Sequence, residues 1–169
     1  PLVRLFSCLV PKAAVRIEFD GQAFSEAVHA EATATPAVSP ASAEPLSPAR
    51  LTITVPLIAL AYGRSGDKGD SANIGVIARR AEFLPLLRHQ LSADAVREYL
   101  AHLVEGDVRR YEWPGLGGLN FLLSQALGGG GMASLRHDAQ GKMLAQILMG
   151  FPLQVPRDWR EAGLLRNSA

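Results

Sequence analysis

A low-complexity segment in the first third of the chain limits what the sequence can fold into. Residues 31–50 read EATATPAVSPASAEPLSPAR, and fifteen of these twenty are Ala, Pro, Ser or Thr. Such a segment buries too little apolar surface to offset the entropy of ordering it, so we interpret it as a linker. A compact domain must therefore be built from the residues that follow it.

The linker divides the 169-residue chain into four predicted parts. The first part contains two short extended pieces and ends at the turn signal Asp20-Gly21. Two strands alone are not stable in water, so we interpret them as remnant strands of a preceding domain. A short helix is predicted from Gln22, before the Ala/Pro-rich residues. The parts are the remnant strands (1–21), the linker region (22–50), the compact domain (51–156) and a polar tail (157–169).

The composition argues against several classes of function. The net charge is +1 and Lys and Arg form no long stripe, so nucleic acid is not an expected partner. The one cysteine, Cys8, cannot form an internal disulfide, which fits a reducing compartment. No segment approaches the roughly 20 apolar residues needed to cross a bilayer. We therefore expect a cytoplasmic protein that does not associate with membranes.

Strands and helices alternate in the compact domain. The apolar run LTITVPLIALAY and the run ANIGVIARR read as strands on either side of a charged loop. Ser92 is an N-cap for a helix that ends at Gly106, and Asp138 is the cap of a second helix that ends at Gly150. Further strands are predicted at DVRRYEW, MASLRH and FPLQVP. This order predicts an α+β fold, a ferredoxin-like split βαβ sandwich with a mostly antiparallel sheet and helices on one face.

The charged loop YGRSGDKGDSANIGV is the first candidate for a site. Asp67 and Asp70 lie three apart with Lys68 between them, and the flanking glycines allow tight turns with exposed N–H groups. The loop could hold an anion through N–H groups and Lys68, or use a carboxylate as a general base whose pKa the lysine tunes. The alternative is a solvated hairpin loop whose residues only make turns. Two residues can close a hairpin, so the length of this loop favours a site.

Two further segments carry polar residues beside glycines. In ALGGGGMASLRHDAQGK, Arg136 offers a planar fork for a carboxylate or phosphate, while Asp138 is better explained as a helix cap. In YEWPGLGGLN, alternation puts Tyr111 and Trp113 on the same side of a strand, and we interpret them as core aromatics rather than a stacking platform. No zinc-ligand spacing and no G-x-S-x-G elbow occurs, so neither a metal, a cofactor nor a hydrolase triad is expected.

Together the three motifs resemble the C-terminal ferredoxin-fold domain of the acyclic terpene utilisation (AtuA) family, over roughly residues 56 to 155. The piece VRLFSCLVPKAAVRIEFDG resembles the end of that family's large N-terminal domain, and we expect the chain to be a fragment of a longer protein. The resemblance implies a ferredoxin-like fold and a link to bacterial breakdown of branched terpenoid acids as coenzyme A thioesters. The family's motif positions in this chain are Ser65, Gly66, Asp67, Lys68, Gly69, Asp70, Asn73, Asn120, Arg136, Asp138, Gly141 and Lys142.

Three hypotheses of function follow. The leading one is an accessory or ligand-binding domain for an acyl-CoA or similar anionic metabolite, with Lys68 and Arg136 at the anion. The second is an enzyme in which Asp67 or Asp70 acts as a base toward a thioester, in hydration or lyase chemistry. The third is a structural domain for oligomerisation, since a sheet can pair at its edge. A homo-oligomer, or association with an AtuA-type N-terminal domain, is expected.

Overall fold

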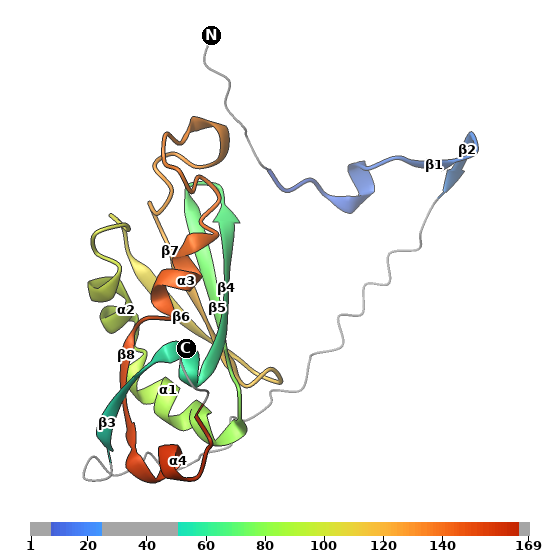
Figure 1. Cartoon of the computed structure of the whole chain (residues 1–169). Coiled ribbons are helices and arrows are strands. Elements are labelled where there is room, and N and C mark those ends of the chain that lie inside the picture. Colours follow the sequence, from blue (N-terminus) through green and yellow to red (C-terminus); the bar gives the residue numbers. More distant parts are fainter. Residues whose placement is uncertain (1–7, 25–50, 166–169) are drawn as a thin grey trace.

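The structure, a computed structural model, describes residues 8–24 and 51–165 (Figure 1). The segment 8–24 contains a short 3-10 helix, η1 (Lys12–Ala14), and an antiparallel hairpin of β1 (Ile17–Phe19) and β2 (Gln22–Phe24). The predicted turn at Asp20-Gly21 is confirmed, since both residues have positive φ, 52° and 76°. The helix expected from Gln22 begins as a strand instead. The rest of that helix and the linker lie outside the described residues.

Antiparallel sheets form the main body. A two-stranded sheet pairs β3 (Leu51–Pro56) with β8 (Pro152–Pro156). A four-stranded sheet has the order β4-β5-β7-β6, in which every neighbouring pair is antiparallel. Its strands are β4 (Ala61–Lys68), β5 (Ser71–Ala78), β6 (Val108–Trp113) and β7 (Gly118–Leu123). This is the α+β arrangement with antiparallel sheets that the sequence predicts.

Short helices cover one face of the larger sheet (Figure 1). Helix α3 packs on β4 and β5, and α2 packs on β6, while α4 packs on the small sheet. The Ser92 cap is confirmed, because its Oγ accepts a hydrogen bond from the N–H of Ala95 at 3.0 Å. The helices are α1 (Leu84–Gln90), α2 (Ala93–Tyr99), α3 (Met143–Leu148) and α4 (Arg157–Glu161), with 3-10 turns η3 (Leu57–Ala59), η4 (Ala81–Phe83) and η5 (Gly131–Ala133).

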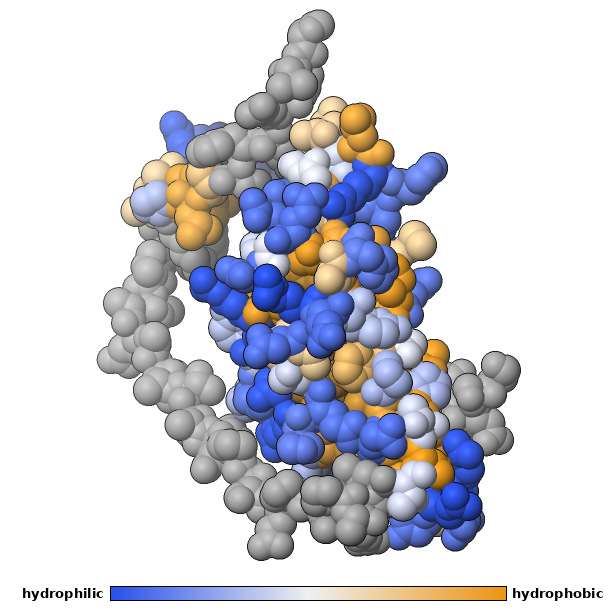
Figure 2. All heavy atoms as spheres, turned by 90° about the vertical axis from the view of Figure 1, so that its left-hand side faces the viewer, coloured by the Kyte–Doolittle hydropathy of each residue, from blue (hydrophilic) through white to orange (hydrophobic). Residues whose placement is uncertain are grey.

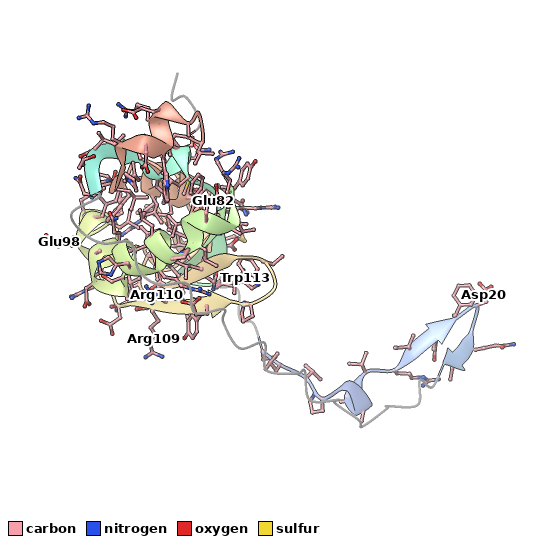
Figure 3. All side chains as sticks on the ribbon, turned by 90° about the horizontal axis from the view of Figure 1, so that it is seen from below. Asp20, Glu82, Glu98, Arg109, Arg110 and Trp113 are labelled. Carbon is pink, nitrogen blue, oxygen red and sulfur yellow. The ribbon has the colours of Figure 1, made fainter. Side chains whose placement is uncertain are left out.

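The core lies between the four-stranded sheet and these helices. Side chains alternate along a strand, so every second residue of β5 and β7 faces the helices. Six of these seven residues are completely buried, and the seventh, Ala78 at the end of β5, is half-buried; the six are Ala72, Ile74, Val76, Leu119, Phe121 and Leu123. On the outer strand β6, Arg110 points toward the helices and donates to the backbone oxygens of Arg88 and Leu91, whereas Arg109 extends from the opposite face (Figure 3).

The tail also contributes to the core. Its first residues form α4 instead of a loose segment, and the Trp159 ring lies 4.8 Å from that of Phe83. Trp159 therefore packs against the core. Within the described residues no helix is both long and apolar enough to cross a membrane.

Several predicted elements are wrong in detail. The strand expected at MASLRH is the turn η5 followed by irregular backbone. The helix expected from Asp138 begins at Met143, and the helix after Ser92 ends at Tyr99. Gly141, with φ +64°, lies inside the pattern of the helix predicted from Asp138 and delays its start, because glycine weakens a helix interior.

The largest error concerns the charged loop, which is a hairpin. Strand β4 continues through it to Lys68, and β5 begins at Ser71. Gly69 and Asp70 alone close the turn, and the φ of +69° at Gly69 suits the first position of a type II′ turn. The argument from loop length therefore fails. An edge strand with one face in water tolerates the charges and glycines that suggested a loop.

Candidate functional site

The face of the four-stranded sheet opposite the helices is open. Three large aromatic side chains on it are exposed, Tyr62 by 57%, Tyr111 by 48% and Trp113 by 39%. The prediction that Tyr111 and Trp113 are core aromatics is therefore wrong. Alternation correctly placed both on one side of β6, but it could not tell which side the helices would cover.

The strand register arranges the open face in rows. Residues directly opposite each other in an antiparallel pair point to the same face. None of the described positions in these rows is Asp or Glu. From β4 to β6 the rows are Tyr62, Ile77, Gly118 and Trp113; Arg64, Gly75, Asn120 and Tyr111; Gly66, Asn73, Leu122 and Arg109; and finally Lys68 and Ser71 on the first two strands.

A groove of about 360 Å³ crosses this face at the β4 edge. Three cations line it, and no carboxylate does. None of the three forms an ion pair with any carboxylate of the described chain. The lining residues are Tyr62, Gly63, Arg64, Ser65, Gly66, Lys68, Asn73, Gly75, Ile77, Trp113 and Lys142.

Two glycines make room for the groove's longest side chains. A Cβ added at Gly66 would lie 3.2 Å from the Nζ of Lys142, so the ammonium group reaches around the strand edge into space that a side chain would fill. A Cβ added at Gly75 would lie 2.8 Å from Cζ3 of Trp113, so the indole reaches over that glycine. The groove therefore depends on these two missing side chains as well as on the side chains that line it.

Ser65 and Asp138 fix the backbone that carries Lys142. The buried hydroxyl of Ser65 donates to the Lys142 oxygen at 3.1 Å and accepts from the Ala145 N–H at 2.9 Å. The Asp138 carboxylate accepts from the N–H groups of Lys142 and Met143 at 2.8 and 2.7 Å. Asp138 thus holds the turn before α3 through the first N–H groups of that helix, although it is not the N-cap that the sequence predicts, and both residues position Lys142.

An amide pair lies beside the groove. The Nδ2 of Asn73, on β5, donates to Oδ1 of Asn120, on β7, at 3.1 Å. Both residues are half-buried, and the pair leaves further donors and acceptors on each amide.

The hairpin tip meets the glycine-rich segment. The Asp70 side chain accepts from the Gly129 N–H at 2.7 Å, and its backbone oxygen accepts from the N–H groups of Ala126 and Leu127. Gly130 packs so closely on Gly69 that an added Cβ would lie 2.1 Å from the Gly69 oxygen. The two loops therefore touch, and Asp70 holds them together there, outside the groove.

Asp67 also lies outside the groove. It pairs with the buried Ala72 and so occupies the helix-facing side of β4, the side opposite Gly66 and Lys68. Its backbone oxygen accepts from the Nζ of Lys68 at 2.9 Å. Neither carboxylate predicted as a base thus lines the groove.

Arg136 lines a different cavity. Its Nη1 donates to the backbone oxygens of Leu103 and Ala126 at 2.6 and 2.7 Å, and its Nη2 lies 3.5 Å from Glu105. This second cavity, of about 410 Å³, lies between the end of α2 and α3 and has mainly apolar walls, together with Asp138. Figure 2 shows apolar patches among hydrophilic ones on the side where α2 lies. Lys68 and Arg136 line separate cavities, so they do not share one anion site.

The predicted residues are therefore distributed over three places. Ser65, Gly66, Lys68, Asn73 and Lys142 line the groove, and Asn120 joins it through Asn73. Gly69 and Asp70 form the hairpin tip, and Arg136 and Asp138 line the second cavity. The buried Gly141, with φ +64°, packs against Leu127, Leu144 and Ala72.

Sequence reasoning missed Tyr62, Arg64 and Trp113. The signal was present in YGRSGDK, whose every second residue is Tyr, Arg, Gly and Lys, and these four share the open face. The guanidinium carbon of Arg79 lies 3.8 Å from the centre of the Tyr62 ring, a cation–π contact that orients this aromatic at the groove's end.

The fold and the groove define a small α+β domain with an antiparallel sheet and a cationic groove on its open face. Within the described residues no group of three His, Cys, Asp or Glu could hold a metal ion. The chain belongs to the AtuA ferredoxin-like domain family, whose model matches residues 55–154, more than half of its length. No curated protein and no solved structure gave a significant match.

Proposed function

We propose that this domain is an accessory ligand-binding domain for acyl-CoA-type metabolites in the breakdown of acyclic terpenes and branched acids. One observation carries the proposal: the Lys142 ammonium occupies the space left by Gly66, on a groove that Arg64 and Lys68 also line. These three cations form no ion pair with any carboxylate of the described residues, which favours an anion as ligand, and guanidinium and ammonium groups bind phosphates well. The groove opens at a sheet edge, so the rest of a long ligand can extend into solvent.

Catalysis by an aspartate is less well supported. A general base must come within about 3 Å of the proton it removes, directly or through one water. Asp70 is engaged at the hairpin tip, and Asp67 lies on the opposite side of β4 from the groove cations. Asp67→Asn is accordingly expected to leave acyl-CoA binding within about twofold. Loss of a measurable turnover on an acyl-CoA in this variant would instead support the enzyme hypothesis.

Binding is tested by thermal shift and calorimetry with coenzyme A, branched acyl-CoAs and the corresponding free acids. At a ligand concentration 100 times Kd, a ligand specific for the folded state stabilises it by about 2.7 kcal/mol. Arg64→Met and Lys142→Met each remove one groove cation while keeping an unbranched side chain, and both are expected to weaken binding. Arg109→Met is the matched control, because Arg109 lies on the same face but does not line the groove.

The outcomes separate the hypotheses. A shift with acyl-CoA that is lost in Lys142→Met and kept in Arg109→Met supports the groove. Equal loss in both variants would indicate attraction by general charge, and no shift with any compound would contradict the proposal. In that case the exposed aromatic face favours the oligomerisation hypothesis, which sedimentation of the parent and of Tyr111→Ser would test.

A further inference from the structure

The indole of Trp113 is placed over the middle of the open sheet face. Trp113 is the last residue of the outer strand β6, and its register partner on β7 is Gly118. With no side chain at Gly118 or Gly75, the ring extends across β7 until its six-membered edge lies over Gly75 on β5. It stays 39% exposed and lines the groove. An exposed indole on a sheet is the kind of platform on which nucleobases stack.

The cations lie within a short reach of this platform. Arg64 is directly opposite Gly75, and Gly66 is the diagonal neighbour of Gly75 across the β4–β5 pair. The Lys142 ammonium lies 3.2 Å from a Cβ added at Gly66, and the indole edge lies 2.8 Å from one added at Gly75, so both groups approach neighbouring positions of the same sheet face.

The amide pair of Asn73 and Asn120 supplies hydrogen-bonding groups beside the indole and the cations. The hydrogen bond from Asn73 to Asn120 uses one donor of the first amide and one lone pair of the second. Each side chain is only half-buried and keeps groups that can bond to a base edge or a ribose hydroxyl. In the strand order from β6 through β7 and β5 to β4, this face thus carries an aromatic ring, two amides and the cations of β4, with Lys142 reaching in from the turn before α3.

From this order we infer that the groove is a mononucleotide subsite, which holds the phosphorylated adenosine end of an acyl-CoA. Trp113 stacks on the base, and Arg64, Lys68 and Lys142 bind the phosphate. The inference rests on the proposed function, since it names the part of the acyl-CoA that the groove holds. The acyl and pantetheine portions then extend past the β4 edge, where the groove opens.

Tryptophan fluorescence tests this placement directly. The chain has two tryptophans, so Trp159→Phe leaves Trp113 as the single reporter. This variant is titrated with adenosine 3′,5′-bisphosphate, coenzyme A, an S-acyl pantetheine and a short oligoadenylate RNA. Adenosine bisphosphate and coenzyme A are expected to quench Trp113, and S-acyl pantetheine is not. In calorimetry Trp113→Ala should raise the Kd for the bisphosphate about 5- to 150-fold, the equivalent of one base stack, while Trp113→Phe retains most binding.

The results distinguish failure of this inference from failure of the proposed function. Acyl-CoA binding that needs Lys142 but leaves Trp113 fluorescence unchanged, without binding of the bisphosphate, would overturn the nucleotide subsite and leave the proposed function standing. Absence of binding by every compound would overturn both. Oligoadenylate binding more tightly than coenzyme A would overturn the assignment to acyl-CoA and indicate single-stranded RNA as the occupant. Circular dichroism of each variant verifies that it is folded.

Discussion

Ser65→Ala tests how the groove is tied to the fold. The Ser65 hydroxyl is the link between the edge strand β4 and the start of α3, through its bonds to the Lys142 oxygen and the Ala145 N–H. Ala145 is 2% exposed, so water cannot replace the lost acceptor at its N–H, while the exposed Lys142 offers its oxygen to solvent. An orphaned buried donor costs about 1–3 kcal/mol.

We therefore expect the free energy of unfolding to fall by about 2 kcal/mol in Ser65→Ala. For a main body that spans residues 51–165 this corresponds to a decrease in Tm of about 8 °C. Binding of acyl-CoA should also weaken, because the Lys142 backbone loses one of its two anchors and the other, Asp138, remains. Urea unfolding followed by circular dichroism measures the first effect, and calorimetry the second.

Ser71→Ala is the matched control. Ser71 lies on the open face next to the turn, and its hydroxyl makes no hydrogen bond among the described residues. Its replacement should change the stability by less than about 0.5 kcal/mol. If Ser65→Ala were as stable as Ser71→Ala, the hydroxyl would not be the link that the geometry indicates, and the reasoning would be refuted.

Three further substitutions test other parts of the structure. Gly130→Ala would place its Cβ 2.1 Å from the Gly69 oxygen and should lower the free energy of unfolding in urea by at least about 3 kcal/mol. Gly131→Ala, whose Cβ meets open space, should lower it by about 1–2 kcal/mol. Equal losses of stability in the two variants would contradict the packing at the hairpin tip. Arg136→Met should lower the free energy of unfolding by about 1.5–3 kcal/mol, because Arg136 donates to two backbone oxygens. These bonds lie outside the groove, so the Kd for coenzyme A should stay within about twofold. A large loss of affinity would instead support one anion site shared by Lys68 and Arg136. Asp138→Ala should lower the free energy of unfolding by about 0.5–2 kcal/mol and weaken the binding of coenzyme A. Asp138→Asn should recover part of the stability and part of the affinity. Unchanged affinity in Asp138→Ala would show that the turn does not position Lys142.

Local signals in the sequence predicted the parts of the fold that local chemistry determines. Ser92 caps its helix, Asp20-Gly21 closes its hairpin, and β8 lies where the last apolar run predicts a strand. The segment from Gly63 to Asp70 was predicted wrongly because glycine and charge are also typical of loops. Backbone pairing with β5 holds this strand, and pairing partners cannot be read from a single segment.

The candidate site was predictable as a set of residue types but not as an arrangement. Ser65 and Gly66 lie more than 75 positions before Lys142, and only the packing of α3 on β4 brings them together. The packing of α2 on β6 decides which face of that strand is covered, and therefore whether Trp113 is a core residue or a platform. Asp67 and Lys68 are adjacent in sequence, yet the alternation of a strand separates them to opposite faces.

The groove depends on side chains that are absent as much as on reactive side chains. On a flat sheet face every residue normally projects a side chain, so a groove forms only where side chains are missing and longer ones lean in from outside. Gly66 admits the ammonium of Lys142 from the turn before α3, and Gly75 admits the indole of Trp113 from β6. A methyl group at either position would displace a cation or an aromatic ring without changing any charge in the motif. Two glycines of this motif are thus needed for the shape of the groove at points where they make no turn, and the conformational freedom that suggested a loop is not what the groove requires.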